Sequence, residues 1–201
     1  MTETRDPLES WPYPPDDGWT SDDLDLFPDD GPGGELDLFK GVQLVDGALI
    51  LRAAQTRLHS RLTDRLYDRL RAQAPAHLRL SSRMDIKIDR WQRPCPDLLV
   101  IDAEAARDMS RTFFDPQEVH LVVEIVSTES EHRDVHVKPR IYAKAGIQHY
   151  WTVLDTCGKP VIHAYELDKA TGSYSGVGIF RSELELEFPF PVTLDVADLL
   201  R

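Results

Sequence analysis

Residues 119–151 contain two strand-like segments with a short helical segment between them, and one acid interrupts the first strand. A continuous apolar run, typical of a buried strand, is formed by Leu121, Val122, Val123, Ile125 and Val126. Glu124 lies inside that run, where a charge is costly unless it is paired or holds a metal. A helix ending at Gly146 and a strand starting near Gln148 are expected to follow. We therefore expect the chemistry of this protein where the acid-bearing strand meets the helix.

The length and composition predict one folded domain. A chain of 201 residues that is 41% hydrophobic can bury a sizeable core, and a second independent domain is not expected. No apolar run approaches the roughly 20 residues of a membrane span, and no signal peptide is expected. Cys95 and Cys157 form no CxxC pair and predict no disulfide framework. A cytoplasmic protein without a membrane partner is therefore expected.

The net charge of −12 is distributed unevenly along the chain. Residues 1–40 hold 12 acids and only two bases, Arg5 and Lys40, whereas the remaining 161 residues have a net charge of −2. An acidic protein is an unusual partner for nucleic acid. The near-neutral body can nevertheless gather its basic residues on one face.

Residues 1–34 are expected to form a largely flexible acidic arm, and residues 35–201 the folded domain. The arm is rich in Pro, Asp and Gly, a composition that buries too little apolar surface to offset chain entropy. Residues 21–27 could form a short helix capped by Ser21, with Leu24 and Phe27 facing inward. The arm is either a solvated acidic segment or an intramolecular mimic of the nucleic-acid backbone that covers a basic groove.

The next two elements are a hairpin and an amphipathic helix. Asp46-Gly47 lies between two β-rich runs in residues 42–51 and predicts the turn of a hairpin. Residues 54–74 predict a helix with a leucine at every fourth position from Leu58 to Leu70. Its other positions carry five arginines, which either form a solvated face or a phosphate-facing stripe: Arg57, Arg61, Arg65, Arg69 and Arg71.

The remaining pattern predicts mainly strands. We expect strands at residues 77–88, 97–101, 160–167 and 172–188, with a bend or bulge at Gly176 and Gly178 in the last. Residues 103–107 predict a helical turn, residues 112–116 a loop and residues 195–200 a short closing helix. The order of elements indicates an α/β or α+β fold with a mixed central β-sheet flanked by helices.

Two carboxylates and a lysine form a candidate site. Asp97 begins one predicted strand and Glu124 lies within the next, so they can converge if the strands are neighbours. Two convergent carboxylates with open positions suit Mg²⁺, which keeps several waters and accepts phosphate oxygens. Lys138 follows closely and could stabilise charge on a phosphoryl group or orient the attacking water.

Pro139 predicts that Lys138 lies at the start of the second helix, because proline is favoured in a helix's first turn. The positive end of the helix dipole would then discourage protonation of Lys138. That would suit a residue that helps to activate water.

Other candidate residues carry less chemistry. His132 and His136 are four residues apart, but no HExxH motif surrounds them, and a solvated or capping role is expected. Tyr150 and Trp151 are expected in core and sheet packing rather than in base stacking.

Four sequence blocks resemble the Uma-two family of restriction endonucleases, within the PD-(D/E)XK nuclease superfamily. The blocks are VQLVDGALI at 42–50, PCPDLLVID at 94–102, VHLVVEIVSTES at 119–130 and HRDVHVKPRIYAKAGIQHYWTVLD at 132–155. The resemblance extends from about Thr20 to the C-terminus and implies a restriction-endonuclease-like fold.

The resemblance also implies roles for individual residues. Asp97 matches the family's PD aspartate and Glu124 the acid of its E-x-[hydrophobic]-S motif. The superfamily lysine would stand two residues after that acid, where this chain has Val126, and Lys138 matches the family's lysine on the following helix. Asp134 matches a position that can orient Lys138, and His59 matches a histidine often seen in the first helix.

The hairpin departs from the family pattern. Gln43 and Ala48 stand where glutamates are frequent. A glutamine can bind a metal-bound water through its carbonyl but supplies no charge, so a site with two acids should hold Mg²⁺ more weakly than one with three.

The expected function is hydrolysis of DNA phosphodiester bonds by a Mg²⁺-dependent endonuclease, in which Mn²⁺ could substitute. Asp97 and Glu124 would hold the metal, Lys138 would assist catalysis, and Gln43, His59 and Asp134 would support them. DNA is the expected partner, and a homodimer is suggested by analogy with the superfamily. The alternatives are a nuclease-fold protein with weak or no catalysis that acts as a binding or regulatory module, and a hydrolase of another phosphate ester.

Overall fold

The structure is a computed structural model that describes residues 6, 8, 9 and 11–200. The chain forms two compact units. The first contains the described residues up to Ala54 together with Asp85–Cys95, and the second contains Gln55–Met84 and Pro96 onwards. The predicted flexibility of residues 1–34 stays a prediction.

The first unit contains the predicted hairpin. Strands β1 (Gln43–Val45) and β2 (Ala48–Ile50) pair antiparallel, which confirms the hairpin. Asp46 and Gly47 have φ values of 50° and 74°, the left-handed conformations that a two-residue hairpin turn requires. The unit also contains the two-residue strand β4 (Asp85–Ile86).

An aromatic cluster and a set of ion pairs hold the rest of the first unit together. The ring centroids of Trp11 and Phe39 are 4.8 Å apart, and those of Phe27 and Phe39 are 4.9 Å apart. The ion pairs join acids from the first 25 residues to three bases, as Asp17–Arg90 at 2.6 Å, Asp22–Lys87 at 2.6 Å and Asp25–Arg93 at 2.8 Å. These acids are therefore paired with bases of their own unit, and the proposed shielding of a DNA-binding groove stays a prediction.

The short helix predicted in residues 21–27 is present, but its predicted cap is not. The chain forms a 3₁₀ helix, η1, at Asp23–Leu26, with Leu24 and Phe27 partly buried as expected. Ser21 does not cap it, because its hydroxyl donates a hydrogen bond to the backbone carbonyl of Asp89.

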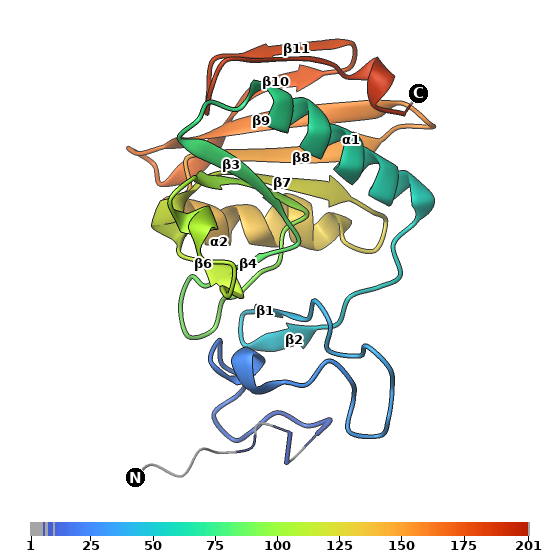
Figure 1. The fold of residues 1–201 in the computed structure, drawn as a ribbon, viewed down its shortest axis with the longest axis vertical. Coiled ribbons are helices and arrows are strands. Elements are labelled where there is room, and N and C mark those ends of the chain that lie inside the picture. Colours follow the sequence, from blue (N-terminus) through green and yellow to red (C-terminus); the bar gives the residue numbers. More distant parts are fainter. Residues whose placement is uncertain (1–5, 7, 10, 201) are drawn as a thin grey trace. The chain divides into compact units, whose positions relative to one another are not determined.

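The second unit is built on a six-stranded mixed sheet in the order β10-β9-β8-β7-β5-β3 (Figure 1). Its strands are β3 (Leu78–Ser82), β5 (Leu98–Asp102), β7 (Val119–Val126), β8 (His149–Asp155), β9 (Pro160–Asp168) and β10 (Ser173–Phe180). Only β7 and β8 pair in parallel within this sheet, and the other neighbours are antiparallel. The predicted mixed sheet with flanking helices is confirmed.

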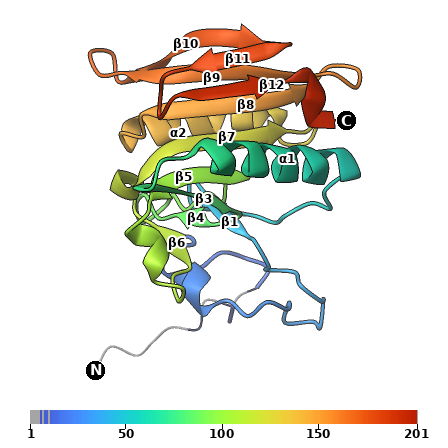
Figure 2. The ribbon, with the colours of Figure 1, turned by 45° about the horizontal axis from the view of Figure 1, so that its top comes forward.

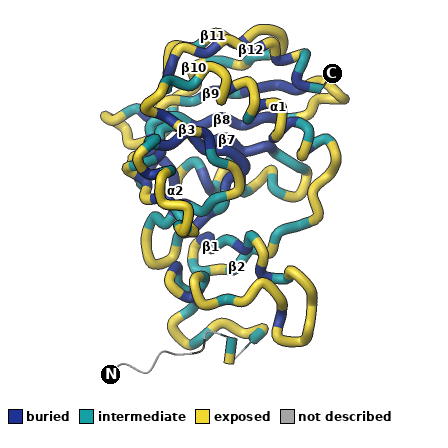
Figure 3. Tube along the Cα trace, viewed as in Figure 1, coloured by how far each residue is buried: buried dark blue, intermediate teal, exposed yellow. Residues whose placement is uncertain are grey.

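Helices α1 (Arg57–Gln73) and α2 (Lys138–Lys144) lie on opposite faces of this sheet (Figures 1 and 2). Leu62, Leu66 and Leu70 of α1 are fully buried in the main core, as their spacing predicts. The antiparallel hairpin of β11 (Glu183–Leu186) and β12 (Val192–Asp195) contributes to the same core, together with the 3₁₀ helix η5 (Ala197–Leu200). Strands β7 and β8 are buried along most of their length (Figure 3).

Two predicted strands and one predicted loop are compared with the structure. The strand expected at 77–88 is broken, because Arg83 adopts a φ of 54° between β3 and β4. The register of β10 against β9 shifts between Gly176 and Gly178, which confirms the bulge. The expected loop at 112–116 contains a two-residue strand, β6 (Phe113–Phe114). Two further 3₁₀ turns, η2 (Ala105–Arg107) and η3 (Pro116–Glu118), complete this region.

Among the described residues, no helix combines the length and the apolar character that a membrane crossing requires.

Candidate active site

Asp97 and Glu124 are brought together by the pairing of β5 with β7. These strands are antiparallel neighbours, with Leu98 opposite Val123, so Asp97 lies at the end of β5 nearest Glu124. The Asp97 carboxylate accepts a hydrogen bond from the backbone N–H of Ile125 at 2.8 Å. Both acids are buried, with exposed fractions of 7% and 2%.

Lys138 reaches Glu124 from the helix that covers this face of the sheet. Its Nζ donates to Glu124 Oε1 at 2.9 Å and forms an ion pair with Asp134 Oδ1 at 2.9 Å. Lys138 is only 3% exposed and Asp134 only 2%. The three residues predicted from widely separated positions therefore form one buried charge cluster.

Tyr142 is a further member of the cluster that the sequence did not identify. Its hydroxyl donates to Glu124 Oε1 at 2.8 Å, and burial raises its pKa, which keeps the phenol protonated as a donor. The spacing of Asp134, Lys138 and Tyr142 places all three on one helical face. That spacing is the signal that could have identified Tyr142.

The expectation that the helix dipole weakens protonation of Lys138 is wrong. A π-helical segment at Arg133–Val137 runs directly into α2, and the backbone N–H of Lys138 donates to the carbonyl of Arg133. Burial acts to lower the pKa of Lys138, but Glu124 and Asp134 outweigh it and hold that pKa above its usual value. Lys138 is therefore protonated at neutral pH.

The cluster has an excess of negative charge. Burial, followed by the nearby charges of Asp134 and Asp97, raises the pKa of Glu124 to about 8 despite the opposing effect of Lys138. Three buried carboxyl groups face one ammonium, and a divalent cation would offset the remaining charge.

The donor set fits a magnesium ion that keeps most of its waters. Lys138 and Tyr142 both donate to Glu124 Oε1, and no donor among the described residues bonds Oε2. Also within the described part of the chain, no group of three or more His, Cys, Asp or Glu side chains is arranged to hold a metal. The protein would thus contribute two carboxylates, Asp97 and Glu124, and water would complete the coordination.

His59 joins the cluster from the first turn of α1. Thr56 caps this helix by accepting from the backbone N–H of His59 at 3.2 Å. His59 Nε2 lies 3.1 Å from Asp97 Oδ2, while its Nδ1 faces the Thr63 hydroxyl at 3.4 Å. His59 is therefore placed to orient the aspartate, and its predicted supporting role stays a prediction.

The predicted supporting role of Gln43 stays a prediction, since this residue belongs to the first unit and the charge cluster to the second. Gln43 is part of β1 in the first unit, where its side-chain carbonyl accepts from the backbone N–H of Cys95 at 3.4 Å.

The histidine pair expected in solvent and the two aromatic residues expected in the core both lie where these roles predict. His132 and His136 are exposed, and their rings are tilted by 53° with centroids 5.4 Å apart. Trp151 is buried in the main core, and Tyr150 is also buried, donating through its hydroxyl to the backbone carbonyl of Asp134.

The sequence model of one family matches residues 40–197, and its description is "Uma2: Putative restriction endonuclease". The match covers most of the chain. This chain belongs to the Uma2 family. The Uma2 assignment confirms the resemblance drawn from the four sequence blocks and supports a nuclease.

A solved structure shares the fold. It is described as a crystal structure of "a putative nuclease belonging to DUF820" from Anabaena variabilis ATCC 29413. The two chains are 14% identical, with a TM-score of 0.65 over 90% of this chain and 97% of that one. A search of curated proteins found no match.

Proposed function

We propose that this Uma2 protein is a Mg²⁺-dependent endonuclease that hydrolyses phosphodiester bonds of DNA, with Mn²⁺ as a substitute. The observation that carries the proposal is the convergence of Asp97, Glu124 and Lys138 in one buried cluster of a nuclease-family fold. When bound, Mg²⁺ would polarise the phosphodiester and lower the pKa of the attacking water. DNA is proposed as the substrate because the family is described as restriction endonucleases.

Each residue of the cluster has a separate task. Asp97 and Glu124 would hold the metal, with Asp97 fixed by His59 and by the backbone N–H of Ile125. Lys138 acts as a charge rather than as a base, because the two carboxylates beside it keep it protonated. It keeps Glu124 oriented and adds positive potential beside the phosphodiester, a form of electrostatic stabilisation.

Binding of Mn²⁺ followed by calorimetry tests the metal site. We expect wild type to bind Mn²⁺ and Asp97→Asn, which keeps the shape but removes the charge, to lose at least tenfold in affinity. Asp68→Asn is the matched control, because Asp68 is an exposed acid on α1. Equal Mn²⁺ affinity in all three proteins would refute the assignment of Asp97 as a ligand.

A second candidate is a binding or regulatory module that keeps the nuclease fold without turnover. Gln43 favours it, because this position carries no charge where the family often has a glutamate. The module would bind DNA equally well with and without Mg²⁺ and would leave plasmid DNA intact. Under this alternative, Asp97→Asn would leave DNA binding unchanged.

A further inference from the structure

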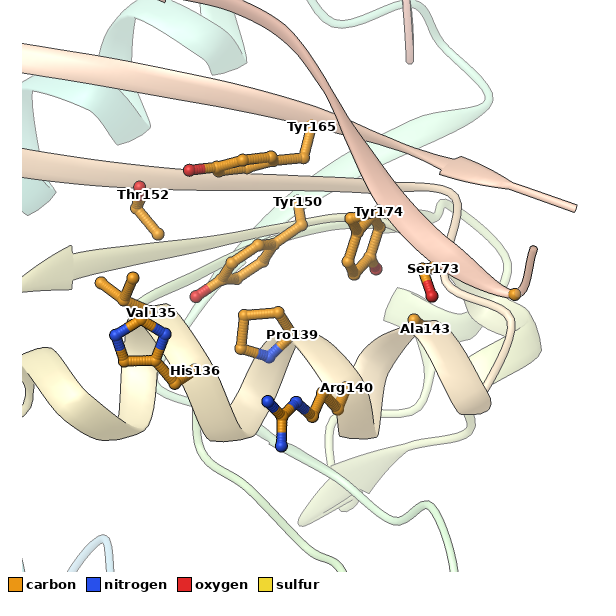
Figure 4. Close-up of a pocket in the computed structure, with 11 residues that line it drawn as sticks. Val135, His136, Pro139, Arg140, Ala143, Tyr150, Thr152, Tyr165, Ser173 and Tyr174 are labelled. Atoms are coloured by element: carbon orange, nitrogen blue, oxygen red, sulfur yellow. The ribbon is translucent and has the colours of Figure 1, made fainter.

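A cavity of about 370 Å³ lies between α2 and the strands β8, β9 and β10, within the second unit (Figure 4). Its volume falls within the range of ligand pockets, roughly 300–1,000 Å³. Its floor is buried at Tyr150 and Thr152, and its rim is exposed at His136, Arg140 and Ser173. The cavity therefore leads from solvent to a closed floor.

Three tyrosines from three neighbouring strands form the sheet side of the cavity (Figure 4). The ring of Tyr150 stacks with Tyr165 at 6.1 Å and 26°, and it lies 5.6 Å from Tyr174. Tyr150 and Tyr174 donate their hydroxyls to the backbone carbonyls of Asp134 and Ile147. These bonds fix the rings in place, so the cavity presents rigid aromatic surface to a ligand.

The helix side adds positive and polar groups. Arg140 is exposed, and no described residue forms an ion pair or hydrogen bond with its guanidinium. His136 lies one helical turn earlier on the same rim. A planar aromatic ligand suits the tyrosine faces, and a phosphate suits the unpaired guanidinium at the rim.

The buried wall contains a further unpaired group. Thr152 Oγ1 is buried, and no hydrogen-bond partner for it is found among the described residues. Buried hydroxyls without partners are uncommon in folded proteins.

We propose that this cavity binds one nucleotide unit, with its base against the tyrosines and its phosphate at Arg140. The inference rests on the proposed nuclease function, since it assigns a place to a nucleotide of the substrate. The cavity adjoins the candidate active site, because Thr152 pairs with Glu124 in the β7–β8 ladder. Lys138 and Arg140 lie on the same short helix, so the cavity and the charge cluster share α2.

The proposal implies a preference among nucleic acids. A base can enter the cavity only when it is not stacked inside a duplex, and removing it from the stack has a free-energy cost. Single strands, frayed ends and free nucleotides should therefore bind better than intact duplex.

Nucleotide binding in EDTA tests the proposal separately from metal-dependent cleavage. The probes are 2-aminopurine deoxyribonucleoside monophosphate, followed by its fluorescence, and a single-stranded oligonucleotide with one 2-aminopurine. We expect binding by wild type, with fluorescence quenched by stacking, and a loss of roughly tenfold or more in Tyr165→Leu. Arg140→Gln should weaken oligonucleotide binding and reduce its salt slope by about 0.7, the loss of one phosphate contact.

Two exposed positions keep the test independent of folding. Ser173→Trp places a large ring in the cavity from an exposed site and should abolish binding of both probes. Arg107→Gln removes the same charge as Arg140→Gln from the exposed turn η2, outside the arginines of α1, and should change nothing. Thermal unfolding of each variant confirms that it is folded.

The outcomes separate the two proposals. Binding of either probe that is lost in Ser173→Trp supports nucleotide binding in the cavity. The relative affinity of the two probes shows whether the cavity prefers a free nucleotide or a nucleotide within a strand. No binding, or binding unchanged in Tyr165→Leu and Ser173→Trp, overturns the cavity proposal. Metal-dependent nicking does not depend on nucleotide binding in EDTA, so it tests the nuclease function separately.

Discussion

Replacing Lys138 with methionine measures how much the ion pairs of the buried cluster contribute to the free energy of unfolding. The ammonium lies 2.9 Å from a carboxylate oxygen of Glu124 and 2.9 Å from one of Asp134, and all three groups are almost fully buried. Removing one partner of a buried ion pair costs about 3–5 kcal/mol, because the charge left behind is not compensated. We therefore expect Lys138→Met to lower the free energy of unfolding by about 3–5 kcal/mol at pH 7.5 without metal.

The same argument predicts how the loss depends on pH. Once Lys138 is gone, the pKa of Glu124, already raised to about 8, should rise further, because its main favourable charge is absent. An acid whose pKa is raised in the folded state gives stability that is present at low pH and lost as pH rises. The difference between wild type and Lys138→Met should therefore be nearly constant from pH 5 to 7 and grow as the pH rises above about 8, where Glu124 is ionised in wild type but still protonated in the variant.

Urea unfolding in EDTA at several pH values measures this effect. Lys144→Met is the matched control, because Lys144 is exposed at the end of the same helix and should change stability by less than about 0.5 kcal/mol. The double variant Lys138→Met/Glu124→Gln should recover part of the loss, since it removes the uncompensated charge as well. A loss below about 1 kcal/mol in Lys138→Met, with no dependence on pH, would refute the reasoning.

Four further predictions concern the same unit. Tyr142→Phe removes a hydrogen bond to Glu124 Oε1 and should cost about 1–2 kcal/mol in urea unfolding, and a neutral result would mean that this bond contributes nothing. The stability of metal-free wild type should fall as pH rises from about 4.5 to 8, the window between the unfolded and folded pKa of Glu124, and Glu124→Gln should flatten this slope. Across that window Mn²⁺ affinity should increase with pH, by at most about tenfold per pH unit, because Glu124 must lose its proton to bind the ion. Leu66→Ala should cost about 2–5 kcal/mol, because Leu66 is fully buried in the main core, and a loss under 1 kcal/mol would contradict that position.

Local sequence signals predicted most of the fold. The Asp46-Gly47 pair and the leucines of α1 act over a few residues, so the hairpin and the amphipathic helix could be expected from spacing alone. The strand at 77–88 was wrong, because its alternating pattern continues across Arg83, where the backbone turns into the left-handed region. Periodicity reports side-chain environment and does not detect a single backbone reversal.

The candidate site was only partly predictable, for a different reason. Glu124 was identified by its cost in a buried strand, and the structure supplies its partners, Lys138 and Tyr142. The charge state of Lys138 depends on two carboxylates that only the tertiary structure brings within 2.9 Å, so a dipole argument based on Pro139 failed. The cavity beside α2 could not be predicted, since it is formed by side chains from three strands and a helix.

We infer that the protein cleaves DNA with a metal ion held by Asp97 and Glu124. Nicking of supercoiled plasmid by purified wild type, with Mg²⁺ or Mn²⁺ and in EDTA, tests it most directly when Asp97→Asn and Asp68→Asn are compared in parallel. We expect nicking by wild type and Asp68→Asn with either metal, none in EDTA and none by Asp97→Asn. Metal-dependent nicking by Asp97→Asn at the wild-type rate, or intact plasmid with every protein, would contradict it.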